Sequence, residues 1–77
     1  MTIKVKLLAS LADRFGQREV GIDHTTGMTV RDAWDRATCG APLLANTLTA
    51  LNLEYCAMNA ALNDGDEVAF FPPVTGG

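Results

Sequence analysis

Residues 29–38 show the clearest helical pattern in this chain, and the amphipathic helix that they predict limits how a core can form. Thr29 is a suitable N-cap residue, and Asp32 follows at the third helical position. Apolar residues then recur at helical spacing on one face, at Val30, Ala33, Trp34 and Ala37. Gly40 and Pro42 end this helix, which we place at 29–38. Because one helix cannot enclose a core, a sheet must complete it, and we interpret Trp34 as a core anchor, not a binding residue.

Alternating apolar and polar residues predict strands on both sides of this helix. The first two strands, expected to pair antiparallel, are separated by a short helix that Ser10 caps and Gly16 ends. The predicted strands are 3–7, 18–23, 48–52, 54–57 and 66–71, with a tight turn at Asn52-Leu53, a loop at 58–63 and a turn at Asp64-Gly65. This order predicts an α+β domain in which a mixed sheet of four to five strands packs on one main helix.

The end of the chain combines a strand exit with an unusual tail. The strand that contains Phe70 and Phe71 runs into Pro72 and Pro73, which cannot continue a strand and favour an extended conformation. The sequence then ends with Thr75, Gly76 and Gly77. Without Cβ atoms, the two glycines allow another protein to close around the backbone and reach the terminal carboxylate. We therefore expect a functional tail, with a frayed terminus as the alternative.

Alternation in the last strand assigns its two phenylalanines to opposite faces. If Phe70 faces the helix, Phe71 lies on the open face of the sheet. Leu8 and Tyr55 are expected to join Phe71 there, in an apolar patch of the kind that marks a protein contact. Burial of Phe71 under a loop is the alternative.

Composition sets the broad class of the protein. The chain has 77 residues, 48 % of them hydrophobic, and a net charge of −3, with no basic stripe that suggests nucleic acid. No apolar run approaches the roughly 20 residues that cross a bilayer, and we find no signal peptide, so a soluble cytoplasmic protein is expected. Asp64, Asp66 and Glu67 form a modest acidic cluster that suits either a basic partner or a solvated turn.

Two cysteines do not make a metal site. Structural zinc requires four ligands and an iron–sulfur cluster four cysteines, whereas this sequence offers Cys39, Cys56 and one histidine, His24. In a reducing compartment a disulfide is not expected either. We expect Cys56 to pack and Cys39 to be partly exposed.

The last fourteen residues, 64–77, resemble the C-terminal signature of the small, sulfur-carrying subunit of molybdopterin synthase. The resemblance extends over the whole chain and implies the ubiquitin-like β-grasp fold, with a domain at 1–71 and a tail at 72–77. One departure lies at Leu7 and Leu8, where members of that family often carry an aromatic residue.

The resemblance also implies a chemistry for the terminus. An activating enzyme of the ubiquitin-activating type adenylates the Gly77 carboxylate with ATP, and sulfur displaces AMP to leave a thiocarboxylate. Its sulfur passes to a cyclic pterin phosphate in the large subunit, with a heterotetramer expected. Gly76, Thr75, Pro73 and Pro72 are expected to carry the tail through the partner's channel. The chain would bind no cofactor and would not be catalytic alone, because it has no acid/base constellation of its own.

Two other functions remain open at this stage. A carrier for thiamine or another thio-metabolite would share the diglycine end, although thiamine-type carriers usually lack the double proline. A ubiquitin-like binding module would have a tail that is never activated.

Overall fold

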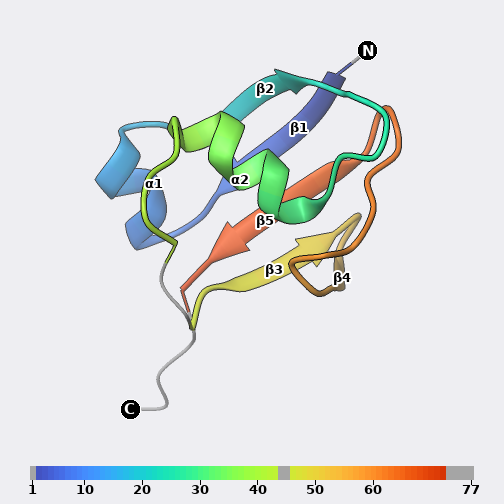
Figure 1. Ribbon diagram of the computed structural model, residues 1–77. Helices are drawn as coiled ribbons and strands as arrows, with labels where there is room; N and C mark the ends of the chain where they lie inside the picture. The colour runs from blue at the N-terminus through green and yellow to red at the C-terminus, as the bar shows by residue number, and fades with distance from the viewer. Residues whose placement is uncertain (1, 44–45, 73–77) are drawn as a thin grey trace.

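One main helix lies across a single sheet (Figure 1). The computed structural model describes residues 2–43 and 46–72. Its elements are β1 (Thr2–Leu7), α1 (Ser10–Phe15), β2 (Glu19–Asp23), α2 (Val30–Thr38), β3 (Leu48–Leu51), β4 (Glu54–Tyr55) and β5 (Glu67–Phe71). The strands are ordered β2-β1-β5-β3-β4 in one sheet. The predicted α+β architecture, a mixed sheet that holds one main helix, is confirmed.

The last strand in sequence occupies the centre of this sheet. β5 pairs in parallel with β1 and antiparallel with β3, and β1 pairs antiparallel with β2 as predicted. The register places Val68 beside Val5 and Phe70 beside Leu7, so that these four side chains form one buried surface. Hydrogen bonds to a neighbour on each side therefore hold β5 up to the point where the tail begins.

The start of α2 is fixed by a reciprocal pair of hydrogen bonds. The Asp32 amide donates to the Thr29 hydroxyl oxygen over 3.3 Å, and the Thr29 amide donates to the Asp32 carboxylate over 2.9 Å. This capping box satisfies two backbone donors that a helix start leaves without partners. The predicted cap at Thr29 and Asp32 is confirmed.

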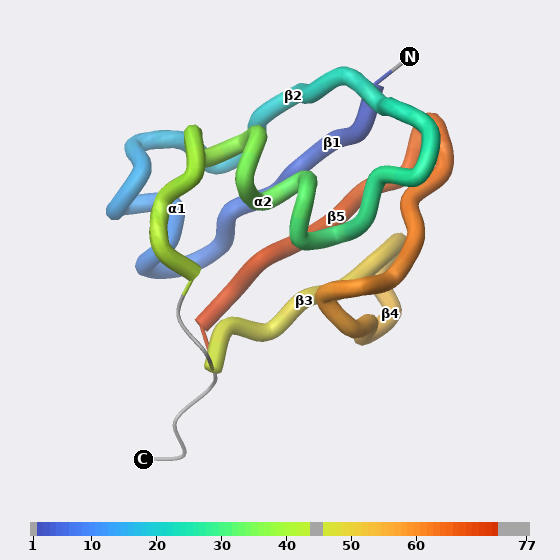
Figure 2. The backbone as a smooth tube through the Cα atoms, viewed as in Figure 1, coloured from blue at the N-terminus to red at the C-terminus, as the bar shows by residue number. Residues whose placement is uncertain are grey.

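The segment between β4 and β5 completes this helix start. Carbonyl oxygens of Ala60 and Met58 accept hydrogen bonds from the amides of Val30 and Arg31, over 3.0 and 2.9 Å. Figure 2 traces this segment along the side of the molecule, past the start of α2. Residues 58–63, which the sequence predicts as a loop, thus form backbone hydrogen bonds to the start of α2.

Trp34 anchors the core between the helix and the sheet. Its side chain is fully buried and makes edge-on contacts with Phe15 and Phe70, at ring-centroid distances of 5.6 and 5.1 Å. The indole N–H donates to the Ala41 carbonyl oxygen over 2.8 Å, so the polar atom is satisfied. The prediction that Trp34 is a core residue is confirmed.

Several predicted details near element ends are wrong. Ser10 is the first residue of α1 and not its cap: Ala9 precedes the helix, with φ 53°, and supplies no side-chain hydrogen bond. At the end of α2 it is Cys39, with φ 56°, that first adopts the left-handed conformation, one residue before Gly40. The strands predicted at 48–52, 54–57 and 66–71 are also shorter by one or two residues. Asn52 lies only in the tight turn predicted at Asn52-Leu53 and not in the strand as well, and Asp66 accepts a 2.7 Å hydrogen bond from the Asn63 amide in the turn before β5.

Candidate functional site

The exit of β5 is the first component of the candidate site. The strand ends at Phe71, and Pro72 follows outside it, half-buried. A proline cannot donate the next ladder hydrogen bond, which explains why pairing stops here. The other predicted tail residues, Pro73, Thr75, Gly76 and Gly77, lie outside the described residues, so the roles assigned to them stay predictions.

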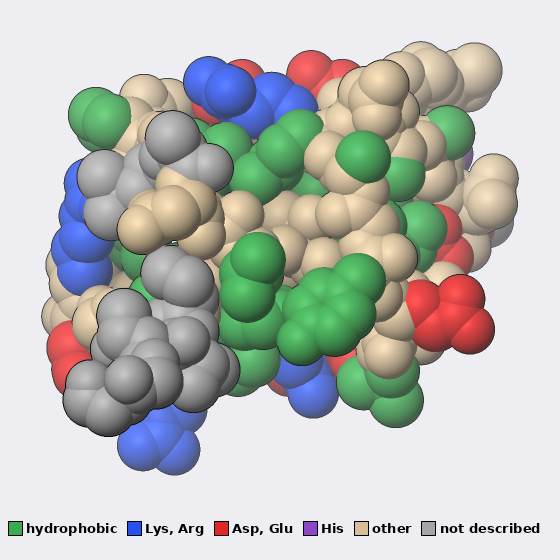
Figure 3. Space-filling model, turned by 90° about the horizontal axis from the view of Figure 1, so that it is seen from below, with side chains coloured by type: hydrophobic (Ala, Val, Ile, Leu, Met, Phe, Trp, Pro, Cys, Tyr) green, Lys and Arg blue, Asp and Glu red, His purple; other side chains and the backbone are tan. Residues whose placement is uncertain are grey.

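An exposed apolar surface lies beside this exit, on the face of the sheet opposite α2. It forms a shallow hollow of about 250 Å³, and we call the six residues that line it the apolar patch: Leu8, Ala50, Leu53, Tyr55, Ala69 and Phe71. Figure 3 shows hydrophobic side chains gathered in the middle of this region of the surface. The structure therefore brings together Leu8, Tyr55 and Phe71, the three residues proposed from the sequence as a partner contact.

Aromatic rings form the centre of the apolar patch. Tyr55 and Phe71 lie 6.0 Å apart between ring centroids, and Tyr55 is 77 % exposed. Phe71 is half-buried on this open face, where it lines the hollow, whereas its neighbour Phe70 is fully buried against Trp34. The prediction that the two phenylalanines divide between the faces is confirmed.

Leu53 belongs to the apolar patch although the sequence analysis did not select it. It lies in the two-residue turn between β3 and β4, and the residue is 89 % exposed. Sequence reasoning treated Asn52-Leu53 only as a tight turn. The missed signal is the leucine itself, because such turns favour glycine at this position.

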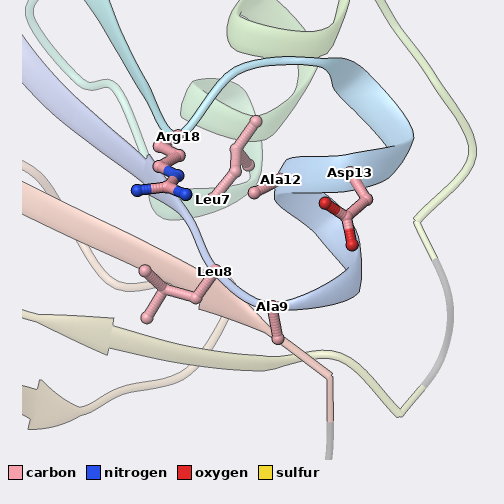
Figure 4. A pocket seen from close by; sticks show the side chains of 6 residues that line it. All are labelled: Leu7, Leu8, Ala9, Ala12, Asp13 and Arg18. Carbon is pink, nitrogen blue, oxygen red and sulfur yellow. The ribbon is translucent and has the colours of Figure 1, made fainter.

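A second, more polar hollow adjoins the apolar patch at Leu8. It measures about 380 Å³ and is lined by Leu7, Leu8, Ala9, Ala12, Asp13 and Arg18. Figure 4 shows Arg18 and Asp13 on opposite sides of it, the first from the bend just before β2 and the second from α1. One acid and one base face open solvent here, and the described residues that line the hollow include neither cysteine nor histidine.

Acidic residues lie at the other end of the apolar patch, and some of them form an ion pair or a hydrogen bond within the chain. Glu67 lies 3.6 Å from the Lys6 ammonium. Asp66 accepts a 3.0 Å hydrogen bond from the Asn52 side-chain amide, while Asp64 is exposed. The predicted acidic cluster is thus both a structured turn and a negatively charged surface.

The cysteines have no metal partners in the part of the chain that the structure describes, where no cluster of three metal-ligating side chains occurs. Both thiols are free: Cys39 is exposed, and Cys56 packs against the core as expected, 3.5 Å from the Thr49 hydroxyl. Within the described residues, no helix has the length and apolar character needed to span a membrane.

Two known proteins match nearly the whole chain. The molybdopterin synthase sulfur carrier subunit of Escherichia coli is 39 % identical over 84 residues, spanning 97 % of this chain and 99 % of that protein. Small archaeal modifier protein 1 of Haloferax volcanii is 36 % identical, over 94 % of this chain and 97 % of that protein.

Solved structures share the fold. The crystal structure of SAMP1 from Haloferax volcanii matches with a TM-score of 0.83 and 35 % identity, covering all of both chains. A chain from the complex of subunits 1 and 2 of molybdopterin-converting factor from Helicobacter pylori matches over the full length of both chains, with a TM-score of 0.68 and 21 % identity. The β-grasp fold expected from the resemblance is confirmed. The ThiS family profile matches residues 5–77, and this chain therefore belongs to the ThiS family.

Proposed function

We propose that this chain is the sulfur carrier of a molybdopterin synthase and that the Gly77 carboxylate is its reactive group. The observation that carries the proposal is the exit of β5: a central strand, paired on both sides, ends beside an exposed apolar patch and continues into Pro72 and a terminal diglycine. The 39 % identity to the Escherichia coli sulfur carrier subunit supports the same function.

The chemistry begins with activation of the terminus. A carboxylate oxygen of Gly77 attacks the α-phosphorus of ATP in the activating enzyme, which releases pyrophosphate and leaves an acyl adenylate. Hydrosulfide, or an equivalent donor, then attacks the carbonyl carbon and expels AMP, so that the chain ends in a thiocarboxylate. Activation is needed because the negative charge of a free carboxylate repels a nucleophile.

Delivery takes place in the large subunit. The thiocarboxylate sulfur is transferred to a cyclic pterin phosphate, and two such transfers build the dithiolene of molybdopterin. The catalytic acids and bases come from the partner proteins, so ATP and pterin are bound there and not by this chain. Pro72 and Pro73 extend the tail, and Thr75 and Gly76 pass through a narrow channel in which the absence of a Cβ at Gly76 is essential.

The apolar patch is the docking surface in this proposal. Leu8, Tyr55 and Phe71 lie next to the tail exit, so a partner that covers them is positioned to receive the tail. The Helicobacter pylori structure contains a complex of two molybdopterin-converting-factor subunits, which supports a large-subunit partner for this chain. The heterotetramer is the assembly that the resemblance implies.

A second candidate function follows from the archaeal relative, which is called a modifier protein. The same adenylate, attacked by a lysine amine in place of sulfur, would join Gly77 to another protein through an amide bond. The two functions therefore differ in the nucleophile that meets the activated terminus. Transfer to a thiamine precursor would use the same thiocarboxylate with another acceptor enzyme.

Mass spectrometry of the intact protein separates these functions. The chain is incubated with activating enzyme, ATP and a sulfur donor, and then with the large subunit and the pterin precursor. We expect the mass change of an oxygen-to-sulfur exchange at Gly77, followed by its loss as sulfurated pterin appears. Formation of amide-linked conjugates in a lysate without thiocarboxylate would favour the modifier function, and an unchanged mass under all conditions would contradict both.

A further inference from the structure

Leu53 combines two unfavourable features at one position. Its φ is 72°, in the left-handed region that the Cβ of any residue other than glycine disfavours, and the residue is 89 % exposed to solvent. In the described part of the chain it is the most exposed of the large hydrophobic residues, ahead of Tyr55 and Leu8. Neither backbone preference nor burial in this chain explains a leucine here.

The turn itself does not depend on the leucine. Asn52, with φ 50°, receives a 3.0 Å hydrogen bond from the Glu67 amide and donates one of 3.0 Å to the Asp66 carboxylate. Its own amide donates to the Glu67 carbonyl oxygen over 2.8 Å. These bonds tie the turn to the start of β5, whereas a two-residue hairpin turn with both φ angles positive favours glycine at the second position.

We propose that Leu53 is a partner-contact residue that extends the apolar patch to its far end and inserts into an apolar recess on the large subunit. This inference rests on the proposed function and adds a specificity-determining residue to it. Leu53 lines the same hollow as Tyr55 and Phe71, so the proposed contact is continuous with the docking surface around the tail exit.

The large subunit is the occupant that the related complex supports, and interface area shows why it would use Leu53. Tyr55 is largely exposed, but Leu8 and Phe71 are already partly buried, so these three residues supply less than half of the ~800 Å² per partner of a stable interface. Leu53 is the exposed apolar residue that the hollow adds to them. The Helicobacter pylori structure contains two molybdopterin-converting-factor subunits together, which favours the large subunit over the activating enzyme as the partner that covers this area.

Acidic residues of this chain near Leu53 indicate which residues should surround the recess on the partner. The Asp66 carboxylate lies beside the turn through its bond from the Asn52 side chain, whereas the Glu67 carboxylate is paired with Lys6, and Figure 3 shows acidic side chains at the border of the hydrophobic region. We therefore expect lysine or arginine around the recess that receives Leu53.

Three substitutions at this position test the inference. Leu53→Gly removes the side chain and relieves the backbone, Leu53→Asn removes the apolar atoms but keeps a residue that tolerates a left-handed φ, and Leu53→Met keeps an apolar side chain. Calorimetric titration of the full chain with the large subunit of its own organism gives the Kd. We expect Leu53→Gly and Leu53→Asn to raise the Kd about tenfold or more, and Leu53→Met to stay within about threefold.

Two further measurements are the melting temperature of each variant and its kcat/KM for adenylation by the activating enzyme. Leu53→Gly should melt at the same temperature as the wild type or a few degrees higher, since strain is lost and no packing is removed. A lower melting temperature would make Leu53 a structural residue, and a Kd within twofold of wild type would exclude the contact; either result overturns the inference and leaves the proposed function intact. If Leu53→Gly lowers kcat/KM for adenylation by the same factor as it weakens binding to the large subunit, the assignment to the large subunit is overturned. Failure of the wild-type chain to bind would contradict the proposed function itself, and the inference with it.

Discussion

The two faces of the sheet are built from alternate residues of the same strands, yet they differ in what they stabilise. On the face that α2 covers, Val68 and Phe70 are fully buried, and Phe70 contacts Trp34. On the open face, Ala69 and Phe71 line the apolar patch, and Phe71 contacts the exposed ring of Tyr55. Phe70 and Phe71 are chemically identical neighbours, so their different roles come from position alone.

This comparison shows where free energy of burial remains available to a partner. Apolar area on the covered face is already removed from water and stabilises the folded chain. On the open face part of the apolar area, mainly at Leu53 and Tyr55, is still in contact with water, so covering it contributes to association. Changes on the covered face should therefore alter unfolding, and changes on the open face should alter binding.

The largest expected effect on stability is on the covered face, at Trp34. Trp34→Ala removes a fully buried ring with its contacts to Phe15 and Phe70 and should lower the free energy of unfolding by about 3–5 kcal/mol. Urea denaturation followed by circular dichroism gives the value. Trp34→Phe, which keeps part of the ring, is the matched variant if the alanine protein does not fold. An unchanged denaturation midpoint would place Trp34 outside the core.

The next effect is on the open face, at Phe71. Phe71→Arg should weaken binding to the large subunit by more than about 1 kcal/mol, the threshold of an energetically important interface residue, while the free chain stays folded. Glu19→Arg is the matched control, because it adds the same side chain to the same face at an exposed position outside the apolar patch. Loss of folding in Phe71→Arg would make Phe71 a core residue and remove the distinction between the faces.

These two residues also show what the sequence could predict. Helical spacing located Trp34 in the core, and strand alternation separated Phe70 from Phe71, because both patterns depend on local geometry. The central place of β5, between β1 and β3, depends on pairing between distant segments, which local patterns do not encode. Ser10 fitted the composition of a cap, but the backbone turns at Ala9 instead. Leu53 required the φ angle and exposure that only the structure supplies.

A smaller effect concerns the helix start that helps to cover the buried face. Hydrogen bonds from the Thr29 backbone, then its hydroxyl group, lower the pKa of Asp32 below its ordinary value of 3.8. This contribution to stability is present above pH 3.8, the unfolded-state value, and is lost as the pH falls through the lower pKa of the folded state.

Comparison with Asp32→Asn isolates this contribution from other carboxylates. The free energy of unfolding, measured by urea denaturation at pH values above and below 3.8, should fall more in the wild type than in the variant. The carboxylate is exposed at the surface, so the difference should be small and weaker in high salt. Parallel pH profiles for the two proteins would contradict the assignment.

The central claim is that the terminal carboxylate of Gly77 is the reactive group, and the most direct test adds one residue after it. The added residue moves the carboxylate away from the atoms that activate it, while folding stability should change by no more than about 0.5 kcal/mol, as at other surface sites. Gly76→Val is a companion variant, because it adds β-branched bulk where the backbone must pass closely. Intact-protein mass spectrometry, combined with an assay of pterin sulfuration, should show thiocarboxylate and product for the wild type and neither for the extended chain. Pterin sulfuration by the extended chain at the wild-type level would contradict the claim that the terminus carries the sulfur.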